Sequence, residues 1–459
     1  MIGMAVAVIE VALTEHGYTG KYWWCGDILA NLTGKIWSDF KSPEGKATFQ
    51  FAVRLFLILL AYYLMKPVRE GLILDGGSAV IRSYALAGQA ALLLILVPFY
   101  SHIIKHLQGD KLFHAVTIFL ASNIMLFYFL GSAGYDIGVP FFIWLGIFSV
   151  LQISQFWTMV SDYHCVESGK RLTSYIAIGG SLGAMIGAMV AKFMYLQLGS
   201  YGLMVLASVM LVVAVLIPTT NTSMRKESAS HSDDESISHL LGGLKRVFDT
   251  SYLRWIAASV VLLNLINSTG EFILADFVTG EKSGDEIGAF YANFYLYVNI
   301  ATLVLQAFVV RPLYQAIGVG GALISLAVLN LAMYVSVLAF PVLAWFAIVK
   351  MADNSIDYSV ANTTKQILFL PLDRFTRYEG MLAINTFFTR FGDLIQGGVI
   401  MLVISVLALP TIFLVGTNIV LCLLWVFVTF NVSNRFKAWT EKSEAALNVE
   451  TEVEGGGQV

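Results

Sequence analysis

The chain has 459 residues, of which 57% are apolar and only 13% are charged. Soluble globular proteins have about 45–50% apolar and about 25% charged residues, so this chain has too few polar groups to cover its apolar surface in water. We therefore expect a lipid bilayer to surround most of it. A net charge of −3 is too small to suggest nucleic acid or another strongly charged macromolecule as a partner.

Twelve apolar stretches are long enough to cross a bilayer, which takes roughly 20 residues in a helix. In chain order they cover residues 48–66, 83–101, 112–131, 139–160, 173–196, 201–218, 252–275, 288–311, 318–339, 341–369, 381–408 and 410–432. A polar, serine-rich segment at 219–250 is predicted to be a cytoplasmic linker between the sixth and seventh stretches. This layout predicts an all-α membrane protein with two six-helix halves, 47–218 and 251–433, like that of the major facilitator superfamily.

The cations of the predicted loops indicate how the chain is oriented. Lysine and arginine gather in the even-numbered loops and at both ends, whereas the odd-numbered loops hold almost none. We therefore expect an N-terminal extension (1–46) and a disordered tail (434–459) that are both cytoplasmic. The first loop is the exception, because it holds Lys66, Arg69 and Arg82.

One face of the predicted first span carries polar groups. Tyr62, Lys66, Arg69 and Glu70 recur at i, i+4, i+7 and i+8, which places them on the same side of a helix. A span presents such a stripe to a water-filled cavity rather than to lipid. The alternative is that Lys66 and Arg69 extend their long stems to the outer membrane interface.

Similar polar stripes recur in three later spans. They comprise Asn264, Asn267 and Glu271 in the seventh span, Lys350, Asp353, Asn354, Asp357, Thr364 and Lys365 in the tenth, and Asn385, Thr389, Arg390, Asp393 and Gln396 in the eleventh. A charge in mid-bilayer costs at least about 2.5–3.5 kcal/mol, so these groups are expected to face a cavity and to neutralise one another. The alternative for Lys350 with Asp353, and for Arg390 with Asp393, is an intrahelical pair that only stabilises the bundle.

Small residues recur every fourth position in the segment 179-GGSLGAMIGAMV-190. A glycine-rich loop that binds phosphate needs free backbone N–H groups, and the interior of a membrane-spanning helix has none. The segment therefore predicts a close helix-packing surface.

The polar stripes favour binding of an anionic small molecule within the bilayer. The predicted substrate-binding residues are Lys66, Arg69, Glu271, Lys350, Asp357, Lys365 and Arg390, and Glu70, Asp353 and Asp393 are the predicted coupling or charge-pairing residues. Fixed cations attract a phosphorylated solute, and carboxylates would pair those cations when the carrier is empty. We expect no metal or cofactor, since the three cysteines lack paired or metal-ligand spacing. We also expect no enzymatic activity and a functional monomer.

Three segments resemble a known family: 62-YYLMKPVREGLIL-74, 156-FWTMVSDYHCVESGKRLTSYIAIGGSLGAMIG-187 and 359-SVANTTKQILFLPLDRFTRYEGMLAINTFFTRFGD-393. They are similar to the nucleotide transporter family of ATP:ADP antiporters, and the similarity extends over residues 36–433. The resemblance implies a twelve-span major-facilitator-like fold in a bacterial inner membrane, and exchange of ATP for ADP or other nucleotides by alternating access.

The resemblance also implies roles for particular residues. It places two cations of the family at Arg69 and Lys365, and a glutamate of the family near Glu271. The acidic residue of the family's fourth span would fall near Gly146, where this chain has no carboxylate.

Two other functions remain open from the residues alone. One is a proton-coupled permease for a non-nucleotide organic solute, in which acidic stripe residues such as Glu271 and Asp357 carry the proton. The other is a membrane scaffold that transports nothing and in which the ionic stripes are structural.

Overall fold

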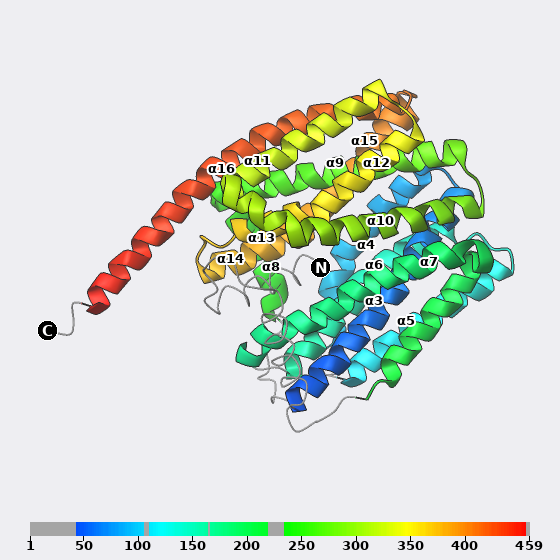
Figure 1. Cartoon of the computed structure of the whole chain (residues 1–459), viewed down its shortest axis with the longest axis horizontal. Coiled ribbons are helices and arrows are strands. Elements are labelled where there is room, and N and C mark those ends of the chain that lie inside the picture. The colour runs from blue at the N-terminus through cyan, green and yellow to red at the C-terminus, as the bar shows by residue number, and fades with distance from the viewer. Residues whose placement is uncertain (1–42, 105–109, 164–165, 219–233, 456–459) are drawn as a thin grey trace, which may run out of the picture. The chain divides into compact units, whose positions relative to one another are not determined.

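A computed structural model describes residues 43–104, 110–163, 166–218 and 234–455, and these residues form helices and no strand (Figure 1). The predicted N-terminal extension up to residue 42 and the first part of the predicted linker lie outside the described residues.

The described helices follow one another in the order that the apolar stretches predicted. They are α3 (Pro43–Asp75), α4 (Ala79–Ile104), α5 (Asp110–Ser132), α6 (Gly138–Tyr163), α7 (Val166–Leu216), α8 (Asp234–Asp249), α9 (Ser251–Glu281), α10 (Asp285–Phe308), α11 (Val310–Ala339), α12 (Leu343–Ile356), the π-helix η2 (Asp357–Ala361), α13 (Asn362–Leu368), α14 (Arg374–Ala383), the π-helix η3 (Ile384–Phe388), α15 (Thr389–Ile400), the π-helix η4 (Met401–Val406) and α16 (Ile412–Gly455).

Ten helical stretches of the described chain are long and apolar enough to cross a membrane. One of them, α7, is broken at Gly199, where φ is 63°, so it contains both the fifth and the sixth predicted spans. The tenth predicted span is divided among α12, η2 and α13, whose charged residues make it less apolar than the others. Together these observations account for all twelve predicted spans.

The first span is longer than the sequence predicted. Helix α3 continues past residue 66 and ends only at Asp75, because Val68, Ile73 and Leu74 extend its buried apolar side beyond the charges. Lys66, Arg69 and Glu70 therefore lie within the helix rather than at its end.

The described residues form two compact units. Each unit differs from the corresponding predicted half of the sequence in one helix. Unit 1 contains residues 43–77, 103–231 and 282–300, and unit 2 contains residues 78–102, 232–281 and 301–455, within the parts of these ranges that are described. Unit 2 thus includes most of α4, and unit 1 includes the first part of α10.

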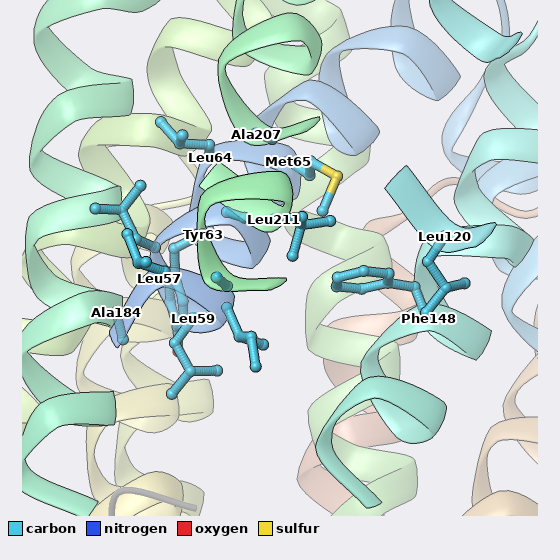
Figure 2. Packing of buried hydrophobic residues seen from close by; sticks show 14 of the residues in the cluster. Leu57, Leu59, Tyr63, Leu64, Met65, Leu120, Phe148, Ala184, Ala207 and Leu211 are labelled. Atoms are coloured by element: carbon cyan, nitrogen blue, oxygen red, sulfur yellow. The ribbon is translucent and has the colours of Figure 1, made fainter. Parts of the chain in front are cut away.

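In unit 1, α3 and α7 pack together through the glycines that the sequence predicted to be a packing surface. A Cβ atom at Gly179 or Gly183 would overlap the backbone of Ala52 or Phe56, respectively. Only a residue without a side chain permits this approach, so the prediction of close packing is confirmed. Figure 2 shows the apolar core around this contact, with residues of α3 beside Ala184 of α7.

In unit 2, the second part of the predicted linker is a helix. Helix α8 packs against α14, where Arg246 Nε donates to Glu379 Oε2 over 2.5 Å and the Arg246 guanidinium lies 4.5 Å from the ring centroid of Phe375. The predicted disordered tail also differs from the structure, because α16 continues as one helix to Gly455 (Figure 1).

Candidate functional site

In unit 1, the two cations of α3 lie against aromatic rings. The ammonium of Lys66 is 4.2 Å from the ring centroid of Tyr295 and 5.2 Å from that of Tyr63. The guanidinium of Arg69 is 4.5 Å from the ring centroid of Phe142. The negative face of an aromatic ring stabilises a cation, most strongly where water is excluded. The rings therefore help to stabilise both cations within the protein.

Glu70 is the carboxylate of this cluster and is fully buried. Arg69 Nε donates to Glu70 Oε1 over 3.0 Å, and the Tyr295 hydroxyl donates to the same oxygen over 3.4 Å. Tyr295 therefore contacts Lys66 with its ring and Glu70 with its hydroxyl. We call Lys66, Arg69, Glu70 and Tyr295 the α3 cluster.

In unit 2, Glu271 of α9 is the centre of a second group of charges. Its carboxylate accepts from Arg82 Nη2 of α4 over 3.3 Å and from Asn354 Nδ2 of α12 over 2.8 Å. The ammonium of Lys350, also on α12, lies 3.9 Å from Glu271 Oε1. Glu271 therefore joins three helices through polar contacts.

Lys350 has closer partners than Glu271. Its ammonium donates to Asp353 Oδ2 over 2.7 Å and to the backbone carbonyl of Asn267 over 3.1 Å. Both charged side chains of the Lys350–Asp353 pair are buried. The intrahelical pair that the sequence left open as an alternative is thus formed, and Asn267 connects it to α9.

The π-helix η2 changes the direction of the polar stripe in the tenth span. At its first residue, Asp357 faces α9 and accepts from Asn267 Nδ2 over 3.2 Å. After it, the Thr364 hydroxyl lies 2.9 Å from that of Tyr314 on α11. The sequence had placed Thr364 on the same face as Lys350, but a π-helix has more residues per turn than an α-helix and rotates the side chains beyond it. Lys365 lies in α13 and is half-buried.

The pair in the eleventh span also reaches α9. Asp393 accepts from Arg390 Nη1 over 3.3 Å, from Asn264 Nδ2 over 2.8 Å and from the Ser268 hydroxyl over 2.9 Å. Polar groups of the tenth and eleventh predicted spans thus both contact α9, which is the seventh predicted span. We call Arg82, Glu271, Lys350, Asp353 and Asn354 the α9 cluster.

Arg82 is the member of the α9 cluster that sequence reasoning did not select. The sequence placed it in the first loop, whereas the structure places it inside α4 and buries it. The sequence does contain a signal for Arg82. Its predicted loop lies on the side of the membrane where the other predicted loops hold almost no lysine or arginine.

A family model matches the C-terminal part of the chain, which carries some of these charges. Residues 322–436 match the family model of the TLC ATP/ADP transporter. This range contains Lys350, Asp357, Lys365 and Arg390. ADP,ATP carrier protein 1 of Rickettsia conorii (strain ATCC VR-613 / Malish 7) is 20% identical over an alignment of 497 residue positions. The alignment covers 91% of this chain and 98% of the carrier.

Solved structures of transporters share the fold. The nucleoside transporter NupG is 13% identical, with a TM-score of 0.59, and the match covers 86% of this chain and 98% of NupG. A bacterial homologue of the iron transporter ferroportin, in its inward-facing state, is 15% identical, with a TM-score of 0.57 and coverage of 84% and 98%.

At these identities the solved structures show the fold alone, and that fold is the predicted one. This chain is therefore a multi-pass membrane protein with a major-facilitator fold, and its resemblance to the ATP/ADP transporter family is confirmed over residues 322–436.

Proposed function

We propose that this protein is a secondary transporter that exchanges nucleotides of the ATP/ADP type, or another phosphorylated anion, across the membrane by alternating access. The observation that carries the proposal is the position of the family match. Residues 322–436 contain the pairs Lys350–Asp353 and Arg390–Asp393, which lie inside predicted membrane spans. The relative from Rickettsia conorii, an ADP,ATP carrier by name, extends the similarity over 91% of this chain.

The pairing of charges supports exchange rather than one-way uptake. Arg69 pairs with Glu70, Lys350 with Asp353, and Arg390 with Asp393. A phosphorylated anion would replace carboxylates as the partner of some of these cations, with arginine binding phosphate oxygens in pairs and lysine acting as a point charge. An anion that leaves without replacement would expose a buried charge, which is costly. Reorientation is therefore easiest when an anion is bound, and an empty carrier with an unpaired buried cation resists it.

The remaining features of the proposal follow from the sequence alone. We place the protein in a bacterial inner membrane with both termini in the cytoplasm, because the even-numbered loops and both ends carry most of the cations. We propose that the protein functions as a monomer, requires no cofactor and catalyses no chemical reaction. The proposed substrate-binding set is Lys66, Arg69, Glu271, Lys350, Asp357, Lys365 and Arg390, with Glu70, Asp353 and Asp393 as pairing residues.

Counterflow into vesicles tests this function. Purified protein is reconstituted into liposomes that contain ADP, and the uptake of labelled ATP is followed. Because Gly146 stands where the family has an acidic residue in its fourth span, ATP, ADP, other nucleotides and sugar phosphates are all tested as internal and external substrates. We expect uptake only when a phosphorylated anion is also present inside.

Substitutions test whether the proposed binding residues are needed for counterflow. Arg69→Gln and Lys365→Gln should each lower counterflow by at least about tenfold, since loss of a charged contact to a desolvated anion costs roughly 2–5 kcal/mol. Lys111→Gln removes an exposed lysine on α5 and should transport like the parent. Uptake that needs no internal anion and is abolished by a protonophore would instead identify a proton-coupled permease.

A further inference from the structure

The donors around Glu271 are those with which proteins bind phosphate. Arg82 contributes a guanidinium at 3.3 Å, Asn354 an amide N–H group at 2.8 Å and Lys350 an ammonium at 3.9 Å. Guanidinium, ammonium and neutral N–H groups together make the strong, short hydrogen bonds that phosphate oxygens accept. Here these donors surround a carboxylate of the protein itself.

We infer that Arg82, Asn354 and Lys350 form a phosphate-binding site that Glu271 occupies in this structure, and that a phosphate of the substrate displaces Glu271 from it. This inference rests on the proposed function and adds Arg82 and Asn354 to its binding residues. It also changes the role of Glu271, which competes with the substrate for these donors instead of contacting the substrate.

The accessibility of the four side chains supports this arrangement. Arg82, Lys350 and Asn354 are 4%, 0% and 1% exposed, respectively. The side chain of Glu271 is 17% exposed. The donors are thus fixed within the protein, and the carboxylate that covers them is the group that solvent reaches. Movement of the Glu271 side chain opens the site without unfolding the helices that hold the donors.

The charges also permit the displacement. Lys350 retains Asp353 at 2.7 Å when Glu271 leaves, so its ammonium keeps a carboxylate partner. A terminal phosphate carries more negative charge than a carboxylate, and it therefore competes well for Arg82 and Asn354. When the phosphate departs, Glu271 restores the neutral state.

Equilibrium binding to the purified full-length protein tests this inference. The affinities for ADP, ATP and inorganic phosphate are measured for the parent, Glu271→Gln, Arg82→Gln and the double variant. Glu271→Gln should bind ADP about tenfold more tightly, and Arg82→Gln at least about tenfold more weakly, because each change alters one close charge contact in a desolvated site.

The double variant distinguishes a loss of ADP affinity from a loss of stability. Removal of both charges should restore the thermal stability lost in Arg82→Gln, because no unpaired charge remains buried. ADP affinity should stay weak, since the guanidinium is still missing. Asp276→Asn removes another carboxylate of α9, which accepts from the Thr411 hydroxyl over 2.5 Å, and should leave ADP affinity unchanged.

The outcomes also separate the inference from the proposed function. If the parent binds nucleotide and Glu271→Gln binds it no more tightly, or if the double variant regains the affinity of the parent, the inference is overturned and the function stands. If no phosphorylated probe binds the parent, both are overturned. Should Glu271→Gln fail to fold, Asn354→Leu replaces it, and unchanged ADP affinity in that variant would overturn the inference.

Discussion

Lys350 and Asp353 stand three residues apart in α12 and form a 2.7 Å ion pair whose side chains are 0% and 2% exposed. A buried charge that loses its partner is strongly destabilising, whereas replacement of both charges by apolar groups is tolerated far better. We predict that Lys350→Met lowers the free energy of unfolding by about 3–5 kcal/mol and that Lys350→Met combined with Asp353→Leu regains most of it. Thermal unfolding in detergent measures both, with the exposed Lys111→Met as control. Equal losses in the single and double variants would contradict this account.

Tyr295 is predicted to act on the α3 cluster through two separable contacts. Tyr295→Phe removes the hydroxyl that donates to Glu70 but keeps the ring 4.2 Å from the Lys66 ammonium, whereas Tyr295→Leu removes both contacts. A desolvated cation–π contact contributes about 2 kcal/mol. Nucleotide affinity should therefore fall only slightly in Tyr295→Phe and by more than tenfold in Tyr295→Leu. Similar affinities in the two variants would show that the ring does not hold Lys66 in place.

Gly183 is predicted to tolerate no side chain. A Cβ atom there would overlap the backbone of Phe56, which cannot move aside as a flexible side chain would. Gly183→Ala should lower the free energy of unfolding by about 1–3 kcal/mol, the usual cost of overpacking. Gly416→Ala in α16 is the matched control, because nothing lies within 4 Å of its added Cβ. The prediction is wrong if both variants unfold at the temperature of the parent.

Asp373 is predicted to stabilise the start of α14 in a pH-dependent way. Its carboxylate accepts from the backbone N–H group of Thr376 over 3.0 Å, and this hydrogen bond holds the pKa of Asp373 below its ordinary value. The folded protein therefore binds this proton more weakly than the unfolded chain. The stabilisation is complete above the ordinary pKa of a carboxyl and is lost as the pH falls through the lower pKa of the folded state.

Two substitutions at Asp373 test this assignment. Asp373→Ala should lower the free energy of unfolding by about 1 kcal/mol at neutral pH through loss of the helix cap. Asp373→Asn keeps a side-chain oxygen that can accept from Thr376 but does not titrate, so its stability should vary less with pH between neutral and acid conditions. Melting temperatures across that range measure both effects. If the melting temperatures of the parent and of Asp373→Asn varied with pH in the same way, a role for the Asp373 charge would be excluded.

Much of the fold could be predicted from the sequence because the bilayer imposes its own rules on the chain. Each span needs a long apolar stretch, and every charge inside it is costly, so composition alone indicates where the helices lie. The spacing of Gly179, Gly183 and Gly187 likewise indicated a packing surface, since that pattern depends only on the helical period. The length of α3 is harder to predict, because charges interrupt its apolar stretch after Met65 while its buried apolar side continues to Leu74.

The partners of the charges could not be predicted in the same way. The sequence by itself determined that Lys66, Glu271, Lys350 and Asp393 each lie on a polar stripe of a different apolar helix. Only the tertiary structure decided that Arg82 of α4 reaches Glu271 of α9 and that Thr364 turns to α11 beyond the π-helix. Helical periodicity is a local property of the chain, whereas the partner of a side chain depends on which helices pack together and on each change of helical pitch.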